Sequence, residues 1–270
     1  MTLILTELSP FGIAMATDTA LTRTVLKPDG TIGDKEYRGG RKLFTVPKLK
    51  AGISCWGWGE IPERGASWEE GQRKYLTELW IPHFLETNKA NYNTISELAM
   101  LLENELRQRI PKINVSEYEL GDGGIHLVGY EEVGGRFDPT FWHIHNGISQ
   151  QLSHKKLVPE IVNANNDIPP EQGRNIVEKK GLLTVRNPPL SEYIALWELL
   201  FKPNSDFSQM VAEEGLSFPF AESLEKRAQL LAFQIETVVG IYRFSKEGGG
   251  ISTPIHTLTI DMEGRIERNF

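Results

Sequence analysis

The sequence has little cysteine: Cys55 is the single one among 270 residues, which excludes an intrachain disulfide bond. Cys55 lies within an apolar run, where a thiol usually packs as a small hydrophobic side chain. A chain without a disulfide framework is typical of a reducing compartment. We therefore expect a cytoplasmic protein.

Long apolar runs are also missing. No segment approaches the roughly 20 consecutive apolar residues that a membrane-spanning helix needs. At the N-terminus no basic region precedes an apolar stretch, and Thr6, Glu7 and Pro10 interrupt the first apolar run, so we expect no signal peptide. The sequence predicts a soluble protein without a membrane partner.

Positive charge is in deficit, with 29 Lys and Arg against 36 Asp and Glu and a net charge of −7. A general binder of nucleic acid or of membrane surfaces needs a basic face, so neither partner is expected. The composition, 40% hydrophobic and 24% charged, is that of an ordinary globular protein with enough length for a large core.

The hydrophobic pattern predicts paired strands in several places. Short runs rich in β-branched residues are separated by turn residues, which is typical of hairpins. A segment with many glycines and charges, residues 23–40, is expected to be a loop. The predicted strands are 2–8 with 12–18, 42–47 with 49–59, 123–132 with 137–147, and a last strand at 253–261.

Two capping-box patterns predict helix starts. Ser67 and Glu70 precede one apolar stripe, in which Pro82 is expected to kink or end the helix. Thr94 and Glu97 precede a second, cleaner stripe. Further helices are expected at about 193–201 and 220–244, and a short strand at 184–187, within a stretch at 148–218 that is otherwise hard to assign.

Runs of strands alternate with runs of helices, without strict βαβ order, which favours an α+β layered fold. Two sheets between two helical layers would bury both the strand runs and the amphipathic stripes. We therefore expect a four-layer αββα sandwich in a single domain, residues 1–270.

The stretch TLILTELSPFGIAMATDTALT resembles the opening of proteasome β-type subunits and their bacterial relatives, which are N-terminal nucleophile hydrolases. In that family a threonine begins the mature chain and an Asp-x-x-x-Thr turn follows the second strand; Thr2, Asp18 and Thr22 have this spacing. GRKLFTVPKLKAGISCWGWGE resembles the family's lysine-bearing strand and the apolar strand ending at glycine. GGIHLVGYEE with FWHIHNG, and GGGISTPIHTLTIDMEG, resemble the later hairpin and the closing strand. The resemblance covers most of the chain except about 148–218.

The resemblance implies a threonine-type peptidase or other amidohydrolase. A terminal threonine attacks through its hydroxyl, and its own α-amine takes the proton. A buried lysine beside the hydroxyl lowers the pKa of both groups, and an aspartate holds that lysine charged and oriented. The resemblance assigns these roles to Thr2, Lys42 and Asp18. It requires no cofactor.

The resemblance also suggests how substrate would bind. A backbone N–H at Gly57, with Gly59 as second candidate, would stabilise the oxyanion of an acyl-transfer intermediate. The backbone from Thr19 and Ala20 to Thr22 would pair with an extended peptide as an added strand. Proteasome-like chains work as rings, so we expect a homo-oligomer, with a ring as one form.

This sequence departs from the family pattern in three places. After the strand at 137–147 the family has a serine near a glycine, and here Asn146 and Gly147 stand there, with Ser149 nearby. Lys42 lies further behind the aspartate than the family lysine does and is chosen by its strand context; Lys35 has nearer spacing but falls in the predicted loop, and ranks second. Before the closing glycines the family has an aspartate and then a serine. Residues 243–247 are Arg-Phe-Ser-Lys-Glu, so Ser245 or Glu247 would have to support the threonine amine.

Each assigned residue also has an ordinary structural interpretation. Thr2 would be a strand edge, Asp18 a turn residue with a local bond, Lys42 a solvated side chain, and Gly57 part of a turn or bulge. The alternative function is therefore a catalytically inactive proteasome-fold subunit with a structural or interaction role. The enzymatic hypothesis also requires Met1 to be removed, because an amide nitrogen at Thr2 has no basic lone pair.

Three histidines form a competing candidate site. In the hairpin predicted at 123–147, His126 is expected opposite His143, and His145 shares the face of His143. Three histidines on one face could hold zinc. No carboxylate or cysteine completes a known spacing, so packing is the favoured interpretation and no metal is expected.

Overall fold

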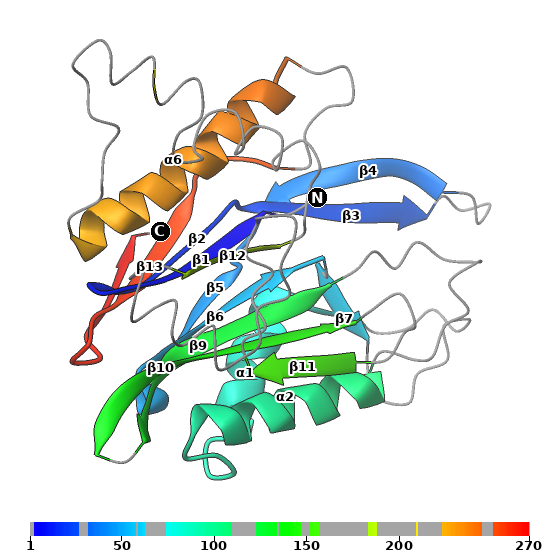
Figure 1. Ribbon diagram of the computed structural model, residues 1–270. Coiled ribbons are helices and arrows are strands. Elements are labelled where there is room, and N and C mark those ends of the chain that lie inside the picture. The colour runs from blue at the N-terminus through cyan, green and yellow to red at the C-terminus, as the bar shows by residue number, and fades with distance from the viewer. Residues whose placement is uncertain are drawn as a thin grey trace.

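The computed structural model describes residues 3–26, 32–57, 59–62, 74–109, 123–133, 135–146, 152–156, 183–187, 209, 223–244 and 251–269. These residues form a mixed α/β structure with two five-stranded antiparallel sheets, two short two-stranded ribbons and three α-helices (Figure 1). The arrangement agrees with an α+β class.

The first sheet is built around the N-terminal hairpin. The predicted pairing of its two strands is confirmed, with Ile4 opposite Thr17 and Ser9 opposite Gly12. Segments from much later in the chain add to both edges of this hairpin. In spatial order the strands are β12 (Leu183–Asn187), β1 (Ile4–Ser9), β2 (Gly12–Thr17), β13 (His256–Ile260) and β14 (Ile266–Asn269).

The second sheet contains both of the other predicted strand pairs. Leu43 lies opposite Ser54, and His143 lies opposite His126 as the sequence predicted. In spatial order the strands are β11 (Leu152–Lys156), β10 (Arg136–Asn146), β9 (Gly124–Val133), β6 (Ala51–Trp56) and β5 (Leu43–Val46), and the short helix η1 (Pro47–Leu49) joins β5 to β6.

The prediction of a loop at residues 23–40 is wrong. β3 (Ala20–Leu26) and β4 (Ile32–Gly39) form an antiparallel ribbon, with Ala20 opposite Gly39 and Leu26 opposite Ile32. Despite its charged residues, the ribbon contains the good strand formers Thr, Val, Ile and Tyr. A second ribbon joins β7 (Glu60–Pro62) to β8 (Lys74–Leu76).

Helix α1 (Thr77–Thr87) begins later than the capping pattern predicts, and Tyr75 and Leu76 belong to β8. Ser67 and Glu70 lie outside the described residues. Pro82 does not end the helix, because the buried side chains of Trp80 and Phe84 hold the flanking turns in the core. Losing one intrahelical hydrogen bond at Pro82 is therefore tolerated.

The second capping box is confirmed at the start of α2 (Ile95–Arg109). The Thr94 hydroxyl accepts from the Glu97 amide at 3.0 Å, and the Glu97 carboxylate accepts from the Thr94 amide at 3.2 Å. Each residue satisfies an amide of the other, so the helix start is specified locally.

Helix α6 (Leu224–Tyr242) confirms the long helix predicted near the C-terminus, although it starts after residue 220. Ser223 caps it by accepting from the Lys226 amide at 3.2 Å. The short helix predicted at about 193–201 lies outside the described residues, whereas β12 confirms the strand predicted at 184–187.

Three apolar cores connect these elements. Leu5, Ala14 and Ala16 on one face of the first sheet pack against α6, through Ala228, Leu231, Ile235 and Val238. Between the two sheets lie Leu8, Ile13, Met15, Leu258 and Ile260 from the first sheet and Leu43, Val128 and Phe141 from the second. The far face of the second sheet packs against α1 and α2, with Ile53, Ile125 and Leu127 beside Trp80, Leu98 and Leu102.

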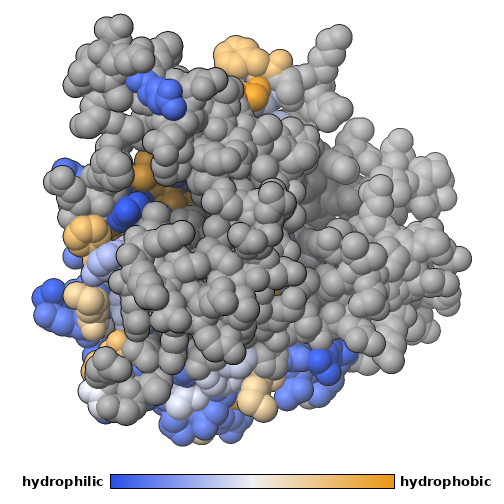
Figure 2. Space-filling view, in the orientation of Figure 1, coloured by the Kyte–Doolittle hydropathy of each residue, from blue (hydrophilic) through white to orange (hydrophobic). Residues whose placement is uncertain are grey.

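Cys55 is buried in the core beneath α1 and α2, which confirms its predicted role as a small apolar side chain. The described surface seen in Figure 2 is largely hydrophilic, with small separate hydrophobic patches. Among the described residues, no helix combines the length and apolarity needed to cross a membrane.

Candidate functional site

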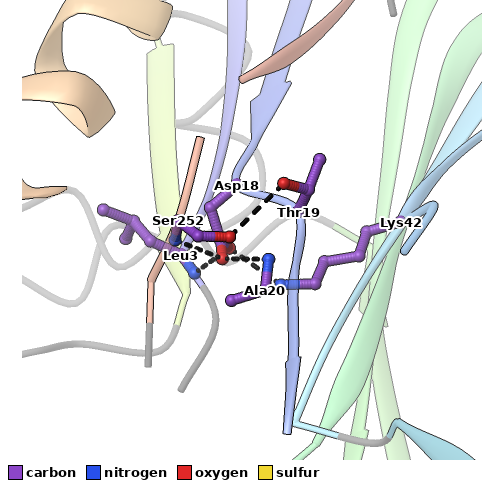
Figure 3. Close-up of polar contacts among 6 residues, drawn as sticks. All are labelled: Leu3, Asp18, Thr19, Ala20, Lys42 and Ser252. Atoms are coloured by element: carbon purple, nitrogen blue, oxygen red, sulfur yellow. Dashed lines mark hydrogen bonds and ion pairs between the residues drawn. The ribbon is translucent and has the colours of Figure 1, made fainter. Parts of the chain in front are cut away.

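Asp18 is the centre of a buried polar junction at the end of β2. Its Oδ1 accepts from the Leu3 amide and from the Lys42 ammonium, each at 2.9 Å. Its Oδ2 accepts from the Ala20 amide at 2.9 Å and from the Ser252 amide at 3.4 Å. Figure 3 shows Lys42 reaching the carboxylate from the side opposite Leu3. Asp18 thus joins four separate parts of the described chain.

The strand pattern brings Asp18 and Lys42 together. Asp18 follows β2, and its own amide donates to the Leu3 carbonyl at 3.3 Å as the last link of the N-terminal hairpin. Lys42 precedes β5, where its carbonyl accepts from the Cys55 amide at 3.1 Å. The two residues therefore come from facing sheets.

The pair is almost completely shielded from water, with 0% of the Asp18 side chain and 3% of the Lys42 side chain exposed. Burial lowers the pKa of Lys42 from its ordinary value, and the adjacent Asp18 carboxylate opposes that change. A buried ammonium without a partner is strongly disfavoured, so Lys42 depends on Asp18. A lysine with a lowered pKa and a bound carboxylate suits the support of a nucleophile.

Thr19 links the two sides of this junction. Its amide donates to the Ser252 carbonyl at 3.3 Å, and its carbonyl accepts from the Gly40 amide at 2.8 Å. Its hydroxyl lies 3.4 Å from the Ser252 hydroxyl. The backbone groups of Thr19 that the sequence assigned to substrate therefore already hold bonds within the chain.

His256 adds a titratable group near the pair. It lies opposite Thr17 in the β2–β13 ladder, and Thr17 directly precedes Asp18 in the sequence. Burial lowers the pKa of His256, and the positive charges of Arg41 and Lys42 lower it further, whereas Asp18 opposes them. The neutral imidazole is thus the form that this site favours.

Gly57 follows β6 with a φ of 77°, in the left-handed region that favours glycine. It comes two residues after Cys55, the residue whose amide bonds the Lys42 carbonyl. Gly59 is half-buried, and its carbonyl accepts from the Thr77 amide at 3.1 Å. Gly57 therefore lies at the end of β6, two residues beyond the strand residue that is bonded to Lys42.

The remaining predicted site residues lie outside the described part of the chain or away from the Asp18–Lys42 contact. Thr2, Ser245 and Glu247 lie outside the described residues. Thr22 occupies β3 opposite Tyr37, and Lys35 occupies β4 opposite Thr24. Lys42, the lysine chosen by its strand context, contacts Asp18.

The histidines are arranged for packing. His126 is buried, its Nδ1 lies 2.9 Å from the Thr6 hydroxyl of the first sheet, and its ring centroid lies 5.4 Å from that of His143. The side chain of His145 is outside the described part. Within that part, no three His, Cys, Asp or Glu side chains are grouped to hold a metal ion.

Two contributors to the junction, the amides of Leu3 and Ser252, could not be predicted from the sequence. Backbone donors carry no residue-specific signal. Ser252 follows the closing glycine turn by resemblance, but its contact with Asp18 spans 234 residues of chain and depends on the β2–β13 pairing.

Comparisons with known proteins give little further information. No protein-family model and no curated protein matches the chain. Among solved structures, the chain is similar to a mutant of Anbu from Hyphomicrobium sp. strain MC1, with 7% sequence identity and a TM-score of 0.43. That alignment covers 100% of this chain and 86% of the other.

Proposed function

We propose that this chain is an N-terminal threonine hydrolase, a peptidase of the proteasome-like kind with Thr2 as nucleophile. The observation that carries the proposal is the buried Asp18–Lys42 pair, bonded to the amide of Leu3. Leu3 directly follows Thr2 in the chain, so a carboxylate and an ammonium meet one residue from the proposed nucleophile.

In the proposed reaction the Thr2 hydroxyl attacks the substrate carbonyl carbon while the α-amine of Thr2 takes the hydroxyl proton. Lys42 stabilises the developing alkoxide, and Asp18 keeps Lys42 charged and oriented. The Gly57 amide donates to the oxyanion of the tetrahedral intermediate. The protonated amine gives its proton to the leaving amine, and water then hydrolyses the acyl ester to free Thr2.

The free edge of β3 is the part of the chain that we propose for an extended peptide substrate. Among the described strands β3 pairs with β4 alone. A peptide added along the other edge, through Thr22 and its neighbours, would form main-chain hydrogen bonds as β-augmentation does. Thr19 and the Ala20 amide would not pair with the peptide. They would fix the position of the first residues of β3 through their bonds to Ser252, Gly40 and Asp18.

The proposed architecture is the four-layer αββα sandwich in one domain of 270 residues. The three cores support it, because α6, the two sheets and the α1–α2 pair each pack on their neighbour. We also propose a homo-oligomer in the reducing cytoplasm, which size-exclusion chromatography with light scattering tests.

Two measurements in sequence test the reaction. Intact mass of the purified native protein shows whether Met1 is removed; a mass that includes Met1 on every molecule overturns the proposal. If Met1 is absent, a threonine-directed peptide epoxyketone is expected to form one covalent adduct per chain, located at Thr2 by fragmentation. Thr2→Ala is the blocked control, and Thr87→Ala, at the exposed end of α1, is the matched control that keeps labelling.

The alternative is a catalytically inactive subunit of the same fold. The sequence of residues 243–247 favours it, because no aspartate is present to support the threonine amine. A chain that lacks Met1, forms the oligomer and gives no Thr2-dependent adduct would identify this alternative.

A further inference from the structure

Ser252 holds the turn that carries Asp18 at three points. Its amide donates to Asp18 Oδ2 at 3.4 Å, and its carbonyl accepts from the Thr19 amide at 3.3 Å. Its hydroxyl faces that of Thr19 at 3.4 Å (Figure 3). The first two contacts use the backbone and are available to any residue, but the third requires a side-chain hydroxyl.

The same turn is bonded to the segment that carries Lys42. The Thr19 carbonyl accepts from the Gly40 amide at 2.8 Å, two residues before Lys42. Thr19 therefore lies between Ser252 on one side and the lysine segment on the other. A shift of Thr19 therefore moves both the Asp18 carboxylate and the segment that carries Lys42.

Burial makes the contacts of Asp18 and Thr19 sensitive to small displacements. Asp18 and Thr19 are 0% and 2% exposed, so water does not compensate for a misplaced carboxylate or hydroxyl. Ile251, the residue before Ser252, is buried in the core under α6 and anchors the segment. The serine hydroxyl thus follows a buried anchor, Ile251, and faces a buried partner, Thr19.

We propose that Ser252 is a positioning residue for the Asp18–Lys42 pair, acting through the contact of its hydroxyl with Thr19. The proposal deepens the proposed function and rests on it for its catalytic consequence, while its structural consequence is measurable without any activity. It gives a role to a residue outside the set that the resemblance assigns.

The direct test is the titration of Lys42 in protein labelled with [ε-¹³C]lysine, with the Lys42 signal assigned by its loss in Lys42→Met. In Ser252→Ala the backbone contacts remain and the hydroxyl contact is lost. A less firmly held Asp18 stabilises the ammonium less, so the Lys42 signal is expected to titrate at lower pH than in the wild type. Ser252→Thr, which keeps a hydroxyl, is expected to restore the wild-type titration.

Two controls separate positioning from general loss of stability. Ser223→Ala removes the serine cap of α6, away from the pair, and is expected to leave the Lys42 titration unchanged. Thr19→Val removes the other hydroxyl and is expected to give the same change as Ser252→Ala, with no further change in the double variant. Unchanged titration in a folded Ser252→Ala protein, or an equal change in Ser223→Ala, overturns the proposal.

Epoxyketone labelling separates this inference from the proposed function. With an active Thr2, Ser252→Ala is expected to lower the labelling rate about five-fold, the size of one lost hydrogen bond. A wild type that is never labelled, with Lys42 shifted in Ser252→Ala, refutes the hydrolase and supports the positioning role. If the wild type and Ser252→Ala are labelled at equal rates and their Lys42 signals titrate at the same pH, the hydrolase is supported and the positioning role is refuted.

Discussion

The backbone amide of Leu3 donates to the carboxylate of Asp18 at 2.9 Å, so the start of the first strand is bonded to the residue that ends the second. The same oxygen accepts from Lys42. One buried atom therefore joins the N-terminal hairpin to the second sheet, and its removal has consequences for stability as well as for the proposed reaction.

Removing either member of the pair is expected to have unequal effects. Asp18→Ala leaves the Lys42 ammonium buried without its carboxylate and is expected to lower the free energy of unfolding by about 3–5 kcal/mol. Lys42→Met leaves Asp18 with three amide donors and is expected to cost about 1 kcal/mol less, because amide bonds still stabilise the carboxylate. Urea unfolding of both variants measures the difference. A larger cost for Lys42→Met would show that Lys42 stabilises the fold in a way that the geometry does not indicate.

Gly57 is expected to resist substitution. With φ at 77°, a side chain there meets the left-handed penalty of about 1–2 kcal/mol, so Gly57→Ala is expected to lower the free energy of unfolding by about that amount. Gly39→Ala is the matched control, because an added Cβ there has nothing within 4 Å and the backbone is not left-handed. Equal unfolding free energies for the two variants would show that Gly57 relaxes without strain.

His256 is expected to make stability depend on pH below its ordinary pKa of 6.5, because its pKa is lowered in the folded state. The unfolded chain then binds more protons, so the free energy of unfolding falls as the pH drops from 6.5 toward the folded pKa. Comparison of the wild type with His256→Asn by urea unfolding between about pH 5 and 8 isolates this residue, since the other histidines are common to both. A difference between the two proteins that does not change with pH contradicts the expectation.

Cys55 is expected to be unreactive while the protein is folded. Burial raises the pKa of its thiol, so neither access nor thiolate is available. A thiol reagent such as a maleimide is expected to modify Cys55 at the rate of unfolding in native buffer and at once in denaturant. Rapid modification under native conditions would show that the core beneath α1 and α2 opens locally.

The predictability of this fold followed the strength of the local signals. The N-terminal hairpin, the 123–147 hairpin and the Thr94–Glu97 box were predictable because alternation and capping are written in neighbouring residues. The β3–β4 ribbon was missed because its charges and glycines match a loop and its bonds come from pairing. The start of α1 was missed because β8 contains Tyr75 and Leu76, which the apolar spacing had assigned to the helix.

The candidate site was predictable in part for a similar reason. The resemblance to a known family identified Asp18 and Lys42 as candidate residues, and the structure brings them into contact. It could not nominate Ser252 or the amide of Leu3, because those contacts arise from the meeting of distant strands. The catalytic roles of all these residues remain predictions that the experiments above address.

The strand order of the first sheet has a consequence for the newly made chain. The hairpin of β1 and β2 leaves the ribosome long before its neighbours β12 and β13, at residues 183–187 and 256–260, are synthesised. Until then both edges of the hairpin lack these permanent neighbours, a condition that favours slow folding and unwanted association. Asp18 likewise lacks its contact with the Ser252 amide until that residue has been synthesised. The junction is therefore completed only after Ser252, 234 residues beyond Asp18, has been translated, which delays the proposed active site until then.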